Sequence, residues 1–295
     1  MAYGMPVFEL GDLRFGGSEP IRVSSFDPGN VEIRTQDSDR AGGDGAFFGR
    51  DFFGSQTWTW EIFTDAWEGD LEENYVQALD LAEEFSAVWH GTRFEPNEVM
   101  PCRYRIGGRW RRVYGRPRRL VGPDGGIVTA QGRAELTADF LRADRLHYDD
   151  EESSITVRKR SSTVGGFLVP FVAPIVLEQP TEGYMPSAFT VGGKAPTYPV
   201  IEITEAGADP WVATEDWRLE LEGTFAPTDV LTIDTRPWAR MVMRNGVPIT
   251  GVLPPRTLLE DIVLRPGPNT FAYGGWGDSA SAQATMRWRN AYYSL

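Results

Sequence analysis

The stretch that most constrains the fold lies at residues 230–250, VLTIDTRPWARMVMRNGVPIT. It holds two runs rich in β-branched and aliphatic residues, and the second run ends at Asn245-Gly246. This dipeptide favours the positive φ angles of a tight type I′ hairpin turn. Within the second run, Met241 and Met243 lie on one face and Val242 lies on the other. This alternation predicts a half-buried antiparallel strand and not a helix.

Two further signals continue the β pattern toward the C-terminus. Residues 264–275, LRPGPNTFAYGG, place a Pro-Gly-Pro-Asn turn before a β-prone run, and the alternating sequence ATMRWRNAYY follows near the end of the chain. From residue 197 onward we expect about eight short strands, with turn residues about every ten positions. Residues 197–295 are therefore predicted to form an antiparallel β-sandwich domain.

The first 150 residues predict another mainly β domain, which contains the one convincing helix of the chain. Residues 57–63, TWTWEIF, alternate and place Trp58 and Trp60 on one face of a strand. Apolar residues recur at helical spacing across residues 69–91, and acidic residues crowd the start of that segment. The helix is expected to pack one face against a sheet.

The chain is predicted to have three parts, because 295 residues exceed the usual span of one hydrophobic core. The charged cluster at residues 149–152 closes the first domain, residues 1–150. Residues 151–196 are rich in proline and glycine. Proline fixes φ and removes a ladder donor, so this segment is predicted to be an extended connector to the sandwich or an edge-strand segment.

Composition limits the classes of function. A net charge of −13 argues against a general nucleic-acid binder, which needs Lys and Arg to replace counterions. The single cysteine, Cys102, excludes an intrachain disulfide. The N-terminus does not have the pattern of a signal peptide, and the most apolar run, residues 164–177, is too short and too rich in proline for a membrane span. We therefore expect a soluble protein without membrane insertion.

An arginine-rich segment stands out in this acidic chain. Residues 102–119, CRYRIGGRWRRVYGRPRR, carry eight arginines, and Gly107-Gly108 predicts a two-residue hairpin. One hypothesis is contact with phosphate or DNA, and the other is a basic strand face that pairs with acidic surface in the same or a neighbouring subunit. The overall charge favours the second. The candidate subunit contacts are Arg103, Arg105, Arg109, Arg111 and Arg112.

The sequence predicts no catalytic, cofactor-binding or metal-binding residue. His90 and His147 have no Cys or His neighbour that would complete a metal site. The glycine- and aspartate-rich residues 37–54, DSDRAGGDGAFFGRDFFG, fit neither a dinucleotide fingerprint nor a calcium loop, and are predicted to be a polar and aromatic loop between two strands. No nucleophile elbow or phosphate-binding loop occurs.

The order of several weak motifs resembles one known family. DGAFFGRD precedes TWTWEI, and YRIGGRWRRVYGRPRR follows the helix. The later motifs are, in order, GGFLVPFVAPIVL, PTYPVIEI, the NG hairpin, LRPGPNT and RWRNAYY. Along nearly its whole length the chain is similar to siphophage distal tail proteins. Residues ADRLHY at the domain border depart from the ending that many relatives have.

The resemblance implies a fold and a structural role. It implies an N-terminal ring-forming belt domain, a split-barrel-like β fold with one helix, and a C-terminal sandwich similar to galectins or carbohydrate-binding modules. The implied assembly is a homohexameric ring that joins the tail tube protein to the tail hub or tip protein, with the tape measure protein as a further partner. The implied location is the tail tip of the virion, after assembly in the host cytoplasm.

Two other functions remain open from the residues alone. The sandwich domain could bind carbohydrate or a receptor through stacking on Trp211, Trp217 and Trp238, although tryptophans in alternating strands usually face the core. A glycan hydrolase with scattered carboxylates would leave no local motif.

Overall fold

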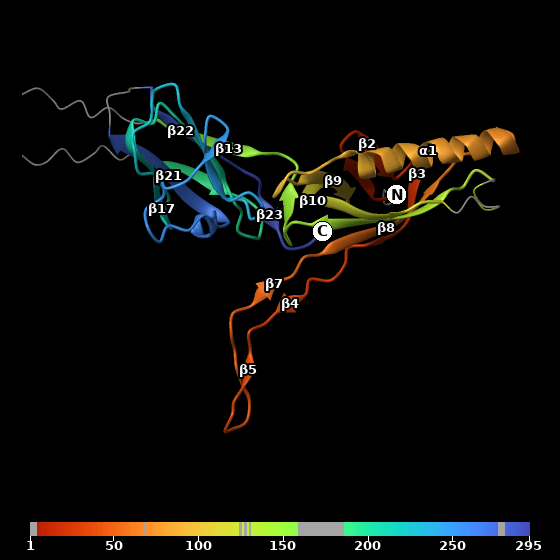
Figure 1. The fold of residues 1–295 in the computed structure, drawn as a ribbon, viewed down its shortest axis with the longest axis horizontal. Helices are drawn as coiled ribbons and strands as arrows, with labels where there is room; N and C mark the ends of the chain where they lie inside the picture. The colour runs from red at the N-terminus through yellow and green to blue at the C-terminus, as the bar shows by residue number, and fades with distance from the viewer. Residues whose placement is uncertain are drawn as a thin grey trace, which may run out of the picture. The chain divides into compact units, whose positions relative to one another are not determined.

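The computed structural model of this chain describes residues 5–67, 69–123, 126, 129, 131–158, 186–276 and 281–295. The chain divides into two units, which we describe separately (Figure 1). Unit 1 comprises Met1–Asp150 together with Tyr292–Leu295, and unit 2 comprises Glu151–Ala291. Antiparallel strands build both units, and the one α-helix of the described residues, α1 (Leu71–Gly91), lies in unit 1. The predicted class, mainly β with one helix, is confirmed.

A twisted antiparallel sheet forms unit 1. Its strand order is β2-β1-β9-β10-β11-β8-β3, and β12 pairs with β10 and with β23. The strands are β1 (Val7–Leu10), β2 (Leu13–Gly16), β3 (Ile21–Asp27), β8 (Thr57–Thr64), β9 (Met100–Ile106), β10 (Arg109–Val121), β11 (Glu135–Arg142), β12 (His147–Asp149) and β23 (Ala291–Tyr292).

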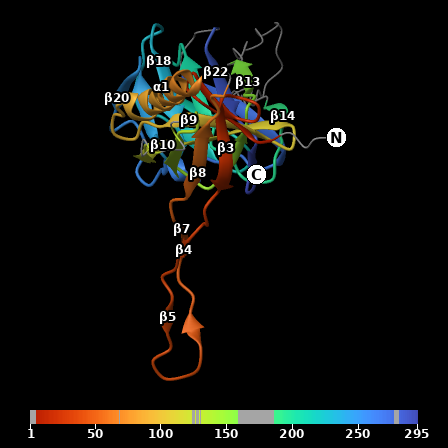
Figure 2. The same ribbon diagram turned by 90° about the vertical axis from the view of Figure 1, so that its right-hand side faces the viewer.

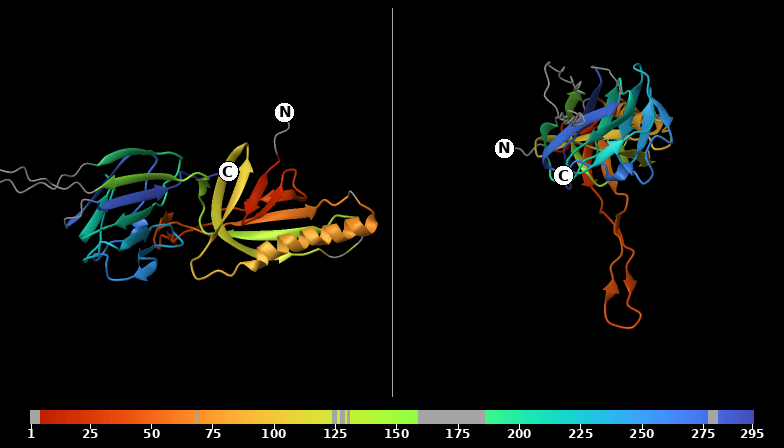
Figure 3. Two further views of the ribbon diagram at one scale, coloured as in Figure 1. Left: turned by 90° about the horizontal axis from the view of Figure 1, so that it is seen from above. Right: turned by 90° about the vertical axis from the view of Figure 1, so that its left-hand side faces the viewer.

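Aromatic side chains fill the core of unit 1. The alternation in β8 buries Trp58 and Trp60 completely, as the sequence predicts. Helix α1 runs along the sheet (Figure 3, left) and brings Trp89 edge-on to Trp60, with ring centroids 6.0 Å apart. Phe85 of the helix meets Phe15 of β2 in the same way at 5.4 Å. Edge-to-face pairs of this kind add to the free energy gained by burial.

The N-terminus of α1 has a complete capping box. The Asp70 side chain accepts hydrogen bonds from the backbone of Glu72 and Glu73, and the Glu73 side chain accepts one from the backbone of Asp70. These bonds satisfy donors that the first helical turn leaves unpaired. Leu71, which the periodicity placed on the apolar face, is 71% exposed because the buried face begins one turn later.

Loss of this cap should measurably weaken unit 1. We expect Asp70→Ala to lower the free energy of unfolding by about 1 kcal/mol. Urea denaturation followed by circular dichroism measures the change. Asp80→Ala, which removes an exposed carboxylate from the same helix, is the control and should change stability by less than about 0.5 kcal/mol. Equal losses in the two variants would contradict a capping role for Asp70.

Between β3 and β8 the chain extends into an arm, residues 28–56. Figures 1 and 2 show this arm standing away from the sheet of unit 1. Two short ladders form it: β4 (Ile33–Arg34) pairs with β7 (Phe52–Phe53), and β5 (Ser38–Asp39) pairs with β6 (Ala46–Phe47). The sequence predicted a loop here. Ladders of two residues are too short to produce a period that a single sequence could reveal.

Unit 2 is a sandwich of two antiparallel sheets. One sheet has the order β13-β22-β15-β18-β19-β20 and the other has the order β14-β21-β16-β17. The strands of the first are β13 (Ser153–Arg158), β15 (Val200–Thr204), β18 (Val230–Asp234), β19 (Met241–Arg244), β20 (Val247–Ile249) and β22 (Gln283–Trp288). Those of the second are β14 (Ser187–Val191), β16 (Ala208–Ala213), β17 (Arg218–Glu220) and β21 (Gly267–Trp276), and a 3-10 turn, η1, spans Leu259–Asp261.

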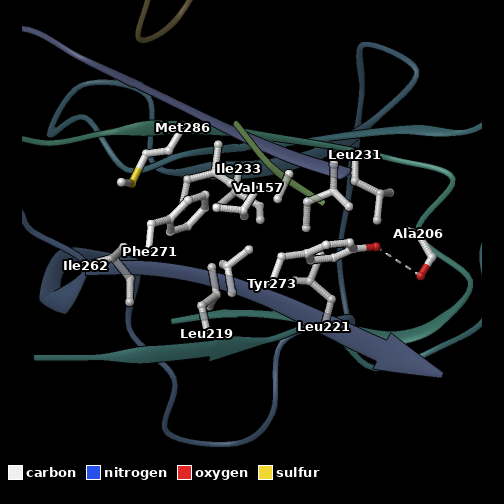
Figure 4. Packing of buried hydrophobic residues seen from close by; sticks show 14 of the residues in the cluster. Val157, Ala206, Leu219, Leu221, Leu231, Ile233, Ile262, Phe271, Tyr273 and Met286 are labelled. Atoms are coloured by element: carbon white, nitrogen blue, oxygen red, sulfur yellow. Dashed lines mark hydrogen bonds between the residues drawn. The ribbon is translucent and has the colours of Figure 1, made fainter. Parts of the chain in front are cut away.

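The core of unit 2 lies between these sheets. Figure 4 shows Phe271 and Tyr273 of β21 among Ile233, Leu231 and Met286 of the opposite sheet. The predicted hairpin closes β19 onto β20, with Asn245 and Gly246 at φ 54° and 78°. Both the sandwich and this turn are therefore confirmed.

The predicted connector, residues 151–196, contains β13 and β14, which lie in different sheets of unit 2. Residues 159–185, including the apolar run at residues 164–177, lie outside the described residues. The predicted three-part division therefore stays a prediction, with a first domain at residues 1–150, a connector at residues 151–196 and a sandwich at residues 197–295. Within the described residues, no helix has the length and apolar character needed to cross a membrane.

Candidate functional site

The described residues contain no cluster of three or more His, Cys, Asp or Glu side chains that could hold a metal ion. Cys102 is buried, and this burial raises the pKa of its thiol far above the usual value. A thiol that stays protonated is a poor nucleophile. Two parts of unit 1 present charged and aromatic side chains at the surface.

The first part is the arginine-rich hairpin. Strands β9 and β10 pair through the predicted turn at Gly107 and Gly108, whose φ angles are 62° and 82°. Because Arg103 lies opposite Arg112, and Trp110 lies opposite Arg105, these four side chains share one face of the sheet.

Ion pairs within unit 1 hold two of the five candidate arginines. Arg103 bonds Glu9 and Asp150, and Arg112 bonds Asp150. Burial alone would raise the pKa of Asp150, but hydrogen bonds from Arg103 and Arg112 lower it below the usual value. These two guanidinium groups therefore stabilise the sheet of unit 1.

Arg111 has a different environment, on the opposite face of β10. Its side chain is only 8% exposed. It donates a hydrogen bond to the Ser294 carbonyl oxygen at 2.7 Å and lies 3.9 Å from the centre of the Tyr292 ring. Arg111 is therefore closed off from a second subunit by the C-terminal residues of its own chain.

Arg105 and Arg109 are the exposed members of the set. They flank the two-glycine turn, and Arg105 lies 5.7 Å from the centre of the Trp110 ring. The five arginines that the sequence grouped as subunit contacts are thus separated by the structure: these two are exposed, and the other three are engaged within unit 1.

The second part is the arm, which the sequence did not single out as a contact surface. Its aromatic side chains are open to solvent: Phe48 is 88% exposed and Phe47 is 62% exposed. Arginines of the arm cover some of these rings, since Arg40 lies 5.2 Å from Phe47 and Arg50 lies 5.2 Å from Phe52. Contiguous exposed apolar surface is typical of interaction sites. The sequence signal that could have identified this contact surface is the pair of Phe-Phe doublets, Phe47-Phe48 and Phe52-Phe53, each followed by glycine.

The neck of the arm is bonded to the core of unit 1. The Gln56 amide nitrogen donates to the carbonyl oxygens of Pro28 and Gly29, at 2.7 and 3.1 Å. Its amide oxygen accepts a hydrogen bond from the buried Arg142 guanidinium. A side chain at Gly29 would collide with the Thr57 carbonyl oxygen, so this close crossing needs glycine. The arm therefore leaves the sheet from a defined position.

The three tryptophans predicted as stacking rings lie in unit 2. Trp211 is buried against Gly274 and has Arg218 4.0 Å from its ring centre. Trp217 donates a hydrogen bond to the Val263 carbonyl oxygen, and Trp238 has Arg236 beside its ring. All three are engaged within unit 2, and glycan stacking on them stays a prediction.

Comparisons with known proteins agree with this architecture. Residues 192–292 match the family model described as siphovirus-type tail component, C-terminal domain. The crystal structure of SPP1 Dit (gp 19.1), described as a paradigm of hub adsorption apparatus in phages infecting Gram-positive bacteria, is similar at a TM-score of 0.60 and 14% identity, over 97% of this chain and 98% of that chain. No curated protein sequence matches.

A second solved structure, the phage p2 baseplate in its activated conformation with Ca, contains a chain that is similar at a TM-score of 0.54 and 10% identity. The match covers 99% of both chains. The resemblance that the order of motifs indicated is thereby confirmed. Residues 192–292 thus match the C-terminal domain of siphovirus-type tail components, and the chain shares its fold with SPP1 Dit.

Proposed function

We propose that this protein is a non-enzymatic structural component of a long non-contractile phage tail, and that six copies form a ring joining the tail tube to the tip or baseplate hub. The arm carries this proposal, because a two-stranded ribbon with exposed Phe47 and Phe48 buries its apolar surface only against another chain. The number six comes from the resemblance to distal tail proteins.

The geometry of the arm fits a ring. An arm that leaves one side of a subunit and docks elsewhere on the next copy makes a heterologous contact, and such contacts close into rings when the rotation allows it. Arg105 and Arg109 add charge that suits an acidic neighbour, since each copy carries a net charge of −13. The same surfaces suit docking of the tube, hub and tape measure proteins in the virion tail tip, after assembly in the host cytoplasm.

Removal of the arm should abolish the ring and preserve the fold. We expect a variant in which a short Gly-Ser linker replaces residues 31–53 to stay monomeric, while the wild-type protein forms open-centred particles alone or with its hub partner. Light scattering and negative-stain microscopy measure the assembly, and circular dichroism verifies the fold. Wild-type protein that remains monomeric with every tail partner would contradict the proposal.

Charge reversal at the hairpin tests the electrostatic part of the contact. We expect Arg105→Glu/Arg109→Glu to weaken ring assembly at least about tenfold at low salt, because like charges placed across an interface repel. The effect should shrink in high salt as screening increases. Arg93→Glu/Arg118→Glu makes the same change of net charge at two exposed arginines away from the turn, and is the matched control. If it weakens assembly equally, net charge and not the hairpin is responsible.

A further inference from the structure

The last four residues of the chain, Tyr292–Leu295, which we call the strap, lie in unit 1. Two anchors hold the strap there. Arg111 donates a hydrogen bond to the Ser294 carbonyl oxygen and faces the Tyr292 ring, and the Tyr292 hydroxyl donates to the Asp149 carboxylate at 3.2 Å. Arg111 is buried, and the strap supplies two of the contacts that compensate its charge. The strap is thus an integral part of unit 1.

One arginine connects the strap to the arm. The Arg145 guanidinium lies 5.1 Å from the centre of the Tyr293 ring in the strap. The same guanidinium lies 3.3 Å from the centre of the Phe53 ring in β7, at the base of the arm. A guanidinium group over aromatic rings is attracted by their electron-rich faces. Arg145 is therefore shared between two segments that are far apart in the sequence.

The base of the arm needs such an anchor. The ladder between β4 and β7, which we call the arm root, has two paired positions, and one further hydrogen bond joins the Gly54 amide to the Glu32 carbonyl oxygen. An isolated two-stranded ribbon is marginal in water even when it is longer than this. Gln56 fixes the neck at Pro28 and Gly29, which lie outside the paired positions of the arm root. We therefore infer that side-chain contacts to Phe53, such as that of Arg145, stabilise the arm root.

We propose that the strap is a positioning element: through Tyr293 and Arg145 it holds the arm root in place. The direction of the arm then depends on residues 292–295, which follow unit 2 in the chain. This inference rests on contacts within unit 1 and does not require the ring. It makes Tyr293 and Arg145 positioning residues for whatever surface the arm contacts.

Hydrogen exchange of the full-length protein tests the proposal. We expect Tyr293→Ala and Arg145→Ala each to speed amide exchange in peptides spanning residues 31–34 and 52–54 by about two- to fivefold, the size expected for loss of one cation–π contact. Exchange in β8 and β11 should stay unchanged. Tyr293→Phe keeps the ring and should behave as the wild type. Leu295→Ala, a change elsewhere in the strap, is the matched control.

A double variant distinguishes an effect of Tyr293 that acts through Arg145 from a general loss of stability in unit 1. If Tyr293 acts through Arg145, then Tyr293→Ala/Arg145→Ala should exchange no faster at the arm root than Arg145→Ala alone. Unchanged exchange in Tyr293→Ala would overturn the proposal, and so would an equal increase in Leu295→Ala. Each variant is measured in a chromatographic fraction of wild-type size, so the result concerns the arm root whether or not rings form.

Discussion

Trp60→Ala should lower the free energy of unfolding of unit 1 by about 3–5 kcal/mol, the range for removal of a large buried aromatic side chain. Trp60 has no solvent exposure and lies at the centre of an aromatic cluster. Its ring meets Phe8 at 5.3 Å, Phe15 at 5.7 Å and Trp89 at 6.0 Å. Removal of the Trp60 ring leaves a cavity between the sheet and α1. We expect this cavity to stay open, because the sheet and the helix are each held by their own hydrogen bonds.

Urea denaturation combined with peptide-resolved hydrogen exchange measures this effect. Peptides of β8, β11 and α1 should lose protection, whereas peptides of β21 and β22 should keep theirs. Trp276→Ala removes a tryptophan that is 67% exposed in unit 2 and serves as the control; its cost should stay within about 0.5 kcal/mol. A loss below about 1 kcal/mol in Trp60→Ala would show that the cluster repacks.

Acid should weaken unit 1 through His147. Both nitrogens of this buried ring have hydrogen-bond partners: Arg142 donates to Nε2 at 3.3 Å, and Nδ1 lies 2.6 Å from the Tyr104 hydroxyl oxygen. Because a guanidinium group only donates, Nε2 is the acceptor and the Nδ1 proton is donated to Tyr104. Burial, and then the charges of Arg142 and Arg111, lower the pKa of His147 to about 3.

The sign of the pH effect follows from this shift. Unfolded His147, with a pKa of 6.5, takes up a proton that the folded protein excludes until about pH 3. The stability that neutral His147 contributes is therefore complete above pH 6.5 and is lost as the pH falls below it. The loss approaches about 1.4 kcal/mol for each pH unit and amounts to about 2 kcal/mol between pH 6.5 and pH 5.

A pH series of urea denaturations of the wild type and His147→Gln isolates this contribution. Asp144 opposes it, because burial raises the pKa of that carboxyl to about 6 and so adds stability as the pH falls toward 4. Since both proteins retain Asp144, its contribution cancels in the difference. The stability difference between the two proteins should change by about 2 kcal/mol in favour of the variant between pH 6.5 and pH 5. Parallel pH profiles would show that His147 is not the acid-sensitive group.

Local patterns in the sequence were sufficient for much of the fold. Alternation in TWTWEIF placed Trp58 and Trp60 in the core, and Asn245-Gly246 determined the turn between β19 and β20. The helix followed from its apolar period and from acidic residues at its start. Such signals succeed because each depends on the backbone geometry of a few consecutive residues, which the same residues satisfy in isolation or in the folded chain.

The candidate site depended on contacts that no local pattern contains. The sequence grouped Arg105, Arg109 and Arg111 together, but Arg111 is buried because Ser294, 183 positions away, accepts its hydrogen bond. In the same way, Arg145 contacts Phe53 and Tyr293, which lie 240 positions apart in the sequence. The sequence by itself determined the helix, the long alternating strands such as β8 and the tight glycine turns of the two hairpins. Only the tertiary structure decided which charges and rings remain exposed, because burial is a property of residues that meet through folding and not of residues that are neighbours in the chain.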